Sequence, residues 1–266
     1  MTPAIDPRAL HLPRLGPDAE VVVYGIAHAG AGAAVWNAVA DSVPPLIEIR
    51  GIRLPGREKR LRQPKHETVH AAAAEIAAVL AQDAAAHGKP VLVAGSCSGA
   101  LLARAALARV AATVPVAGLF VARQPPPSWP NDEDARIAAL GSAELRVWAR
   151  RTGLTPATLL DNDKLFGFFE ALLRADLALT AGYVHQTPPL SCPIILLQPP
   201  GGSKLTSSYV SAWQSETKGP THVLDVPCDG DGDLLVSHPA RFAAAIARAW
   251  SLVDCATNGA SRRATP

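Results

Sequence analysis

Short apolar runs alternate with longer alanine-rich segments along most of the chain, and Gly or Pro marks many of the boundaries. This alternation is typical of βαβ units wound into a mainly parallel sheet with helices on both faces, so the predicted fold class is α/β. The apolar runs predict strands at residues 20–26, 45–49, 91–94, 116–122, 193–197 and 223–226. The longer patterns predict helices at residues 68–87, 99–112 and 240–253.

The alternation breaks between residues 125 and 183, where the patterns are helical, at residues 133–151, 156–160 and 164–182. Thr155-Pro156 indicates an N-cap followed by proline in the first helical turn. A helical insertion of nearly 60 residues between two strands is typical of a lid over a substrate pocket. We therefore expect one α/β domain over residues 1–255, with 125–183 as a helical lid subdomain and 256–266 as a flexible tail.

Composition narrows the class of protein. The 266 residues are 48% hydrophobic and 18% charged, which predicts one domain with a large core. A net charge of +2 gives no general attraction to nucleic acid, and no apolar segment has the length to span a membrane, so neither is an expected partner. The 4 cysteines are scattered without a CxxC pair, which favours a reducing, cytoplasmic setting over disulfides or zinc. We expect a cytoplasmic monomer.

The candidate nucleophile lies in the sequence VLVAGSCSGALL, residues 91–102, where a predicted strand leads directly into a helix. The pattern G-x-Nuc-x-G at such a junction predicts a nucleophile elbow. Both glycines are required because a Cβ there would collide with the neighbouring strand or helix. Cys97 alone has Gly two residues to either side, so Cys97 replaces the usual serine. The N-terminus of the following helix favours an anion, so it favours the thiolate form of Cys97. The alternative interpretation is that Cys97 is a small apolar residue in an inactive turn.

A second glycine-rich segment, residues 28–32, follows the first predicted strand. A dinucleotide-binding G-x-G-x-x-G is disfavoured, because Val35 stands where the third Gly or Ala belongs. The favoured interpretation is a loop that supplies one oxyanion N–H of an α/β hydrolase, the other coming from Ser98. His28 then faces the substrate, with a structural histidine as the alternative.

Several motifs carry a resemblance to a known family: His28-Ala29-Gly30, LPGRE at residues 54–58, the elbow at 95–99, LLRAD at 172–176, Cys192-Pro193 and Trp213. From about residue 21 to residue 250 the chain resembles the stand-alone (type II) thioesterases of polyketide and nonribosomal peptide assembly lines, in the α/β-hydrolase superfamily.

This resemblance implies a helical lid over an acyl pocket, oxyanion donors at the backbones of Ala29 and Ser98, and no separate cofactor. It implies as substrate an acyl group carried as a thioester on the phosphopantetheine arm of an acyl or peptidyl carrier protein. By the same resemblance, Arg57, Lys59, Arg60, Arg62 and Lys65 meet an acidic carrier surface. An ordinary solvated loop is the alternative for that stretch.

The chain departs from the family at the other triad positions. The segment after the strand at 193–197 contains no carboxylate, and Arg123-Gln124 occupies the end of the preceding strand. Where the family has its histidine, Asp233 aligns best, and we expect Asp233 to take a catalytic role. His222 is expected at the far end of its strand from the pocket and His238 lies beyond the expected place, so neither is favoured as the base.

These changes bear on the reaction. Transfer of an acyl group from a pantetheine thiol to Cys97 exchanges one thioester for another and needs no strong base. Release by water needs a base, and a carboxylate is a poor one at pH 7. We therefore predict thioester cleavage, acyl transfer or cyclisation through Cys97. The alternatives are a non-hydrolytic enzyme (cyclase, dehydratase or isomerase) and a non-catalytic assembly-line partner.

A metal site is not expected. Asp229, Asp231 and Asp233 have the spacing of a cation-binding loop, but the Gly and Glu that complete a calcium loop are absent.

Overall fold

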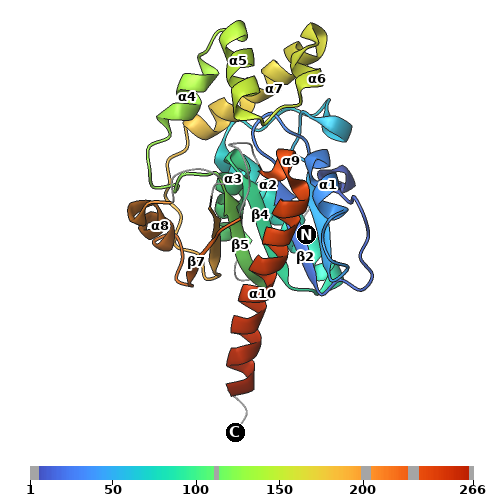
Figure 1. The fold of residues 1–266 in the computed structure, drawn as a ribbon, viewed down its shortest axis with the longest axis vertical. Helices are drawn as coiled ribbons and strands as arrows, with labels where there is room; N and C mark the ends of the chain where they lie inside the picture. Colours follow the sequence, from blue (N-terminus) through green and yellow to red (C-terminus); the bar gives the residue numbers. More distant parts are fainter. Residues whose placement is uncertain (1–5, 111–113, 199–204, 227–233, 264–266) are drawn as a thin grey trace.

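The computed structural model describes residues 6–110, 114–198, 205–226 and 234–263, with side chains described as far as Asp254. Within these ranges the chain forms a 7-stranded sheet in the order β1-β3-β2-β4-β5-β6-β7 (Figure 1). All neighbouring strands are parallel except β1 and β3. The predicted α/β class is confirmed. The strands are β1 (Leu10–His11), β2 (Val21–Ile26), β3 (Ile47–Ile52), β4 (Val91–Ser96), β5 (Val116–Ala122), β6 (Ile194–Leu197) and β7 (Thr221–Leu224).

Both faces of the sheet are buried, which explains why the central strands are continuous apolar runs. In β2, Val22 and Tyr24 join the core under helices α2 (Val69–His87) and α3 (Ser98–Val110). Val21 and Val23 face the opposite core, under α1 (Asn37–Ala40) and α10 (Pro239–Arg263). Of the helices in the described ranges, none is long and apolar enough to cross a membrane.

Several elements differ from the sequence prediction. Strand β3 continues to Ile52, and β1 and the helices α8 (Ser207–Gln214) and α9 (Leu234–Ser237) were not predicted. These elements are too short or too polar to show a clear apolar period. Helix α10 extends to Arg263, so residues 256–263 of the expected tail are helical. The prediction ended where the apolar period ends, because the next residues include Thr257, Asn258 and Gly259, which are weak helix formers.

The lid consists of α4 (Asp132–Ala138), α5 (Ser142–Thr152), α6 (Ala157–Leu160) and α7 (Asp163–Ala181). These helices lie together beyond one end of the strands, at the top of Figure 1, and share an apolar cluster that includes Ala29 of the loop after β2. The pattern at residues 133–151 is two helices, separated near Gly141. The predicted Thr155 N-cap is wrong: Pro156, extended with ψ 139°, precedes the helix, which begins at Ala157.

A buried ion pair ties α3 to the turn that follows α8, and a hydrogen bond ties it to the chain that returns from the lid. The guanidinium of Arg104 is fully buried, and its Nε donates to Oε2 of Glu216 at 2.7 Å. Arg104 also donates to the carbonyl oxygen of Pro188 at 2.9 Å. His185 lies 3.1 Å from the same Glu216 oxygen, and burial lowers the pKa of this histidine. The network fixes α3, the helix that begins beside Cys97.

Candidate active site

Cys97 occupies a strained turn between β4 and α3. Its φ is +51°, a conformation that costs an L residue about 1–2 kcal/mol. The turn is held from both sides: the N–H of Cys97 donates to the carbonyl of Ala122 at the end of β5, and its carbonyl accepts from Ala100, each at 2.8 Å. The side chain of Cys97 is half-buried. The strand–turn–helix predicted from the glycine spacing is therefore present.

The two elbow glycines are needed for the reason that the sequence suggests. A Cβ on Gly95 would lie 2.4 Å from the backbone nitrogen of Ala100, and one on Gly99 would lie 2.3 Å from the carbonyl oxygen of Ile26. All of these contacts are to backbone, which cannot move aside as a flexible side chain can. Glycine at both positions lets α3 start directly against the ends of β2 and β4.

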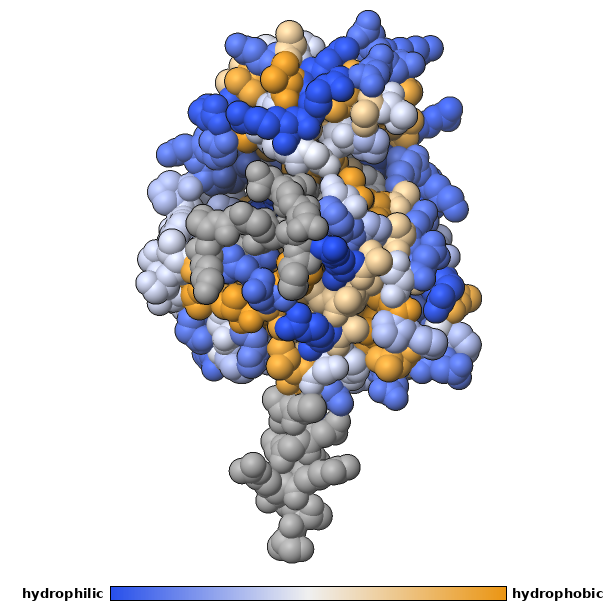
Figure 2. All heavy atoms as spheres, viewed as in Figure 1, coloured by the Kyte–Doolittle hydropathy of each residue, from blue (hydrophilic) through white to orange (hydrophobic). Residues whose placement is uncertain are grey.

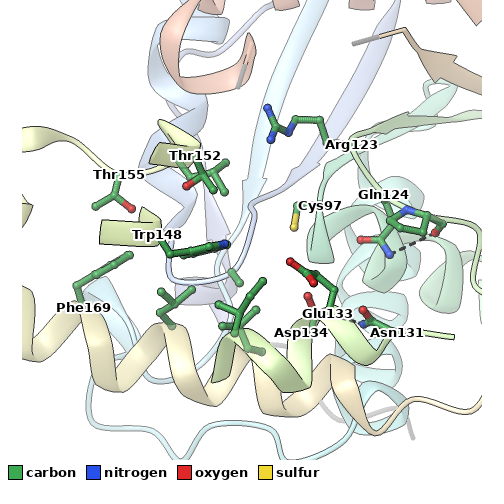
Figure 3. A pocket seen from close by; sticks show the side chains of 16 residues that line it. Cys97, Arg123, Gln124, Asn131, Glu133, Asp134, Trp148, Thr152, Thr155 and Phe169 are labelled. Carbon is green, nitrogen blue, oxygen red and sulfur yellow. Dashed lines mark hydrogen bonds between the residues drawn. The ribbon is translucent and has the colours of Figure 1, made fainter. Parts of the chain in front are cut away.

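A cavity of about 250 Å³ lies between this turn and the lid (Figure 3). Cys97 points into it from the sheet side, and the lid helices supply an apolar wall. The large apolar side chains that line it are Ile137, Trp148, Leu154, Phe169, Leu173 and Leu177. A pocket that is mostly apolar, with a few convergent polar groups, is typical of a site for a small molecule.

Polar residues that the sequence analysis did not assign also line the cavity. Glu133 and Asp134 of α4 bring carboxylates toward the sulfur of Cys97 (Figure 3). Asp134 accepts hydrogen bonds from Asn131 at 2.7 Å and from Thr180 at 2.6 Å. A hydrogen bond from Arg136 lowers the pKa of Glu133, which keeps this carboxylate ionised. The acidic run at 132–134 was the available signal, but a charged helix start has many structural explanations.

The end of β5 also contributes to the cavity, through Arg123 and Gln124. Arg123 has φ +52°, a second strained residue next to the elbow. The carbonyl oxygen of Gln124 accepts the indole N–H of Trp213 at 3.1 Å and the hydroxyl of Tyr209, both from α8. Trp213 is one of the residues that carry the family resemblance. It is fully buried and holds the backbone at the end of β5, although it does not itself line the cavity.

The two expected oxyanion donors lie at this edge of the sheet. Ala29 lines the cavity and is 8% exposed, and Ser98 is the first residue of α3, next to Cys97. Within the described ranges, no backbone carbonyl accepts a hydrogen bond from the N–H of Ala29, and the N–H of Ser98, as the first residue of α3, has no acceptor within that helix. His28 is not among the cavity-lining residues. Its Nε2 lies 3.1 Å from the carbonyl oxygen of Leu154 in the lid, which favours the structural interpretation.

Other residues considered from the sequence lie elsewhere. Asp233, Asp229 and Asp231 are outside the described residues. Gln198 follows β6, where an acid would stand, and accepts from the N–H of Leu205 at 2.9 Å. His222 lies near the start of β7 and His238 directly before α10, so neither lines the cavity. In the described part of the chain, no cluster of His, Cys, Asp and Glu has the composition of a metal site.

The expectation for the basic stretch is wrong for two of its five residues. Arg57 and Arg60 are each 6% exposed. Arg57 pairs with Asp176 at 2.7 Å, and Arg60 pairs with Glu75 and donates to the carbonyl of Arg53 at 2.8 Å. A buried guanidinium with internal partners cannot meet a partner protein. Lys59, Arg62 and Lys65 are exposed.

A mainly parallel sheet with a nucleophile elbow at a strand end and a lid inserted before β6 defines an α/β hydrolase. Residues 23–238 match the family model described as the thioesterase domain. Because the match spans most of the chain, the chain belongs to the thioesterase domain family and has the fold of an α/β-hydrolase enzyme.

Individual relatives are distant. The linear gramicidin dehydrogenase LgrE of Brevibacillus parabrevis is 24% identical, over 79% of this chain and 81% of its own length. The thioesterase PikA5 of Streptomyces venezuelae is 25% identical, over 77% of this chain and 72% of its own. The solved structure of RedJ, a thioesterase from the prodiginine biosynthetic pathway of Streptomyces coelicolor, has a TM-score of 0.74 and 24% identity, over 87% of this chain and 91% of RedJ.

The strain at residue 97 can be measured with two variants that both lack the thiol. We expect Cys97→Gly to be more stable than Cys97→Ala by about 1 kcal/mol in urea unfolding, because glycine adopts a positive φ without a Cβ penalty. Ala74→Gly, on the exposed face of α2, is the control and should lose about 1 kcal/mol instead. A Cys97→Gly variant no more stable than Cys97→Ala would contradict a strained elbow.

Proposed function

We propose that the chain is a thioesterase-like enzyme of polyketide or nonribosomal peptide biosynthesis, which accepts an acyl group from the phosphopantetheine thiol of a carrier protein onto Cys97. The observation that carries the proposal is the placement of Cys97, at φ +51° on the elbow and facing a lid-covered cavity. Membership of the thioesterase domain family supports it. The similarity to the thioesterase PikA5 and to RedJ, a thioesterase from a biosynthetic pathway, supports the biosynthetic setting.

In the proposed step, the Cys97 thiolate attacks the thioester carbonyl, and the negative charge develops on the carbonyl oxygen. The N–H groups of Ala29 and Ser98 stabilise that oxygen. The bond between the acyl carbon and the pantetheine sulfur then breaks, and the pantetheine leaves as a thiolate that takes up a proton. The start of α3 favours the thiolate form of Cys97, so the exchange proceeds without a strong base.

The fate of the acyl group depends on the groups around it. Among the described residues that line the cavity, none is a histidine, and its carboxylates are Glu133 and Asp134. Ionised carboxylates activate water poorly at pH 7. This supports acyl transfer or cyclisation over efficient hydrolysis. In this proposal Asp233 serves as the proton carrier for the second step.

The covalent intermediate is tested by intact mass after incubation with an acyl-pantetheine thioester. The wild-type chain should gain the mass of the acyl group on Cys97. Cys97→Ala should gain nothing, and Cys97→Ser should react more slowly because its hydroxyl needs a base. An unmodified wild-type chain, or a Cys97→Ala variant that turns over substrate at the full rate, would exclude covalent catalysis and favour noncovalent use of the cavity.

The missing base is tested at position 233. We expect Asp233→His to raise the rate of hydrolysis of the acyl-enzyme by roughly 10²-fold, within the range for a positioned general base. The measurement is the decay of the acyl-enzyme mass with time in the absence of other acceptors. Asp225→His, an exposed position after β7, is the control. Equal decay in all the proteins would show that lack of a histidine at 233 does not limit hydrolysis.

We further propose that the carrier protein docks near the lid, on the exposed charges left in the basic stretch. Lys59 and Arg62 are exposed, and Lys65 donates to the carbonyl of Ala171 on α7 at 3.2 Å, which places the stretch beside the lid. Exposed apolar side chains accompany these charges, with Leu61 67% and Phe168 69% exposed. Figure 2 shows one face of the lid, where hydrophilic residues are interspersed with hydrophobic ones.

Charge reversal tests this docking surface. A Lys59→Glu/Arg62→Glu variant should require about tenfold more carrier-bound substrate for half-maximal acylation, while acylation by free acyl-pantetheine stays unchanged. The defect should shrink as salt is raised. Arg109→Glu/Lys218→Glu carries the same charge change on exposed residues, at the end of α3 and just before β7, away from the lid. If that control shows the same defect, the effect comes from net charge alone.

A further inference from the structure

The loop that carries Ala29 is a tight turn of defined type. The N–H of Ala31 donates to the carbonyl of His28 at 3.1 Å, and Gly30 has φ +79° while Ala29 is not in the positive-φ region. This combination is the signature of a type II turn, which requires glycine at its third position. Because peptide groups are planar, the N–H of Ala29 points opposite to the His28 carbonyl, and so away from the closed side of the turn.

A buried ion pair holds this turn from the lid. Oδ2 of Asp176, on α7, accepts the N–H of Gly30 at 2.8 Å. Arg57 donates to both carboxylate oxygens of Asp176, at 2.9 and 2.7 Å, and its Nη1 also donates to the carbonyl of Ala31 at 2.8 Å. Arg57 and Asp176 are 6% and 9% exposed. The pair therefore fixes both the central peptide of the turn and its last residue.

The same pair couples the turn to the wall of the cavity. Asp176 lies on α7, which also contributes Phe169, Leu173 and Leu177 to that wall. A Cβ on Gly30 would lie 2.7 Å from the ring of Phe169, so the turn and the helix are in close contact. A displacement of α7 must therefore break the Gly30–Asp176 bond or carry the turn with it.

We propose that Arg57 and Asp176 are positioning residues for acylation, which orient the Ala29 N–H toward the developing oxyanion. Because Asp176 lies on α7, this orientation depends on the position of α7 over the cavity. The proposal rests on the function proposed above. Stabilisation of an oxyanion depends on donors held at the correct distance before the charge forms, and a buried two-pronged ion pair provides that rigidity. The pair belongs to the LPGRE and LLRAD motifs, and its burial replaces the carrier contact that the sequence suggested for Arg57.

The test compares two reactions at the same sulfur. Acylation of Cys97 by an acyl-pantetheine thioester passes through an oxyanion, whereas alkylation by iodoacetamide displaces iodide and does not. Asp176→Asn has one acceptor oxygen in place of two, so it cannot accept the Gly30 N–H and both hydrogen bonds from Arg57. Its acylation rate at saturating thioester should therefore fall by roughly 10²-fold. Its alkylation rate and half-saturating thioester concentration should change by less than about threefold. Arg57→Lys keeps the positive charge but cannot donate two parallel hydrogen bonds to Asp176, so its acylation rate should fall about tenfold.

The control is Asp161→Asn, which removes an exposed lid ion pair with Arg150 and should acylate at the wild-type rate. Thermal unfolding of each variant reports its stability. If Asp176→Asn does not fold, Arg57→Lys decides the matter. Wild-type acylation rates in a folded variant, or equal losses in acylation and alkylation, would overturn the positioning role and leave the proposed function standing. A wild-type chain that is alkylated but never acylated would overturn the proposed function and this inference with it.

Discussion

The candidate active site, at the ends of β2, β4 and β5, depends on one backbone conformation, the positive φ of Cys97. A strained residue persists only where its neighbours leave no alternative. Here the carbonyl of Ala122 binds its N–H, and Gly99 lets α3 start against the carbonyl of Ile26. These contacts bring the ends of β2, β4 and β5 together at the elbow. The loop after β2 and the Arg123-Gln124 segment after β5 are consequently placed beside the thiol.

The lid is joined to this edge by polar as well as apolar contacts. Its helices share a core with Ala29, but the buried pair of Arg57 and Asp176 fixes the orientation of the turn. Burying two charges removes hydration that the attraction between them only partly replaces, so such a pair contributes little net stability. What it contributes is a defined geometry. The buried pair of Arg104 and Glu216 acts similarly on α3.

The composition of the cavity agrees with chemistry that needs an activated thiol more than an activated water. Its described lining combines a half-buried cysteine, lid carboxylates, an arginine and aromatic walls. A serine nucleophile in this place would need a base to remove its proton, whereas a thiol close to a helix N-terminus ionises more readily. In the function proposed above, the exchange of cysteine for serine and the departure from the family's histidine are compatible changes, which together would favour thioester exchange.

Much of the fold and the placement of Cys97 on the turn between β4 and α3 could be predicted from the sequence, because they depend on local pattern. Alternation of apolar runs and alanine-rich helices indicated the parallel sheet, and the glycine spacing singled out Cys97 from its neighbouring serines. Short elements such as β1, α8 and α9 were missed, since a few residues cannot establish a period. The split near Gly141 was missed because a helical pattern continues across it.

Contacts between distant segments were decided by the tertiary structure alone. Arg57 looked like a surface charge in a basic stretch, and only the packing of α7 shows that it is buried against Asp176, a residue 119 positions away. The entry of Glu133 and Asp134 into the cavity likewise depends on how α4 lies over the sheet. A sequence specifies which residues can ionise or donate, but whether they meet water or each other depends on the packing around them.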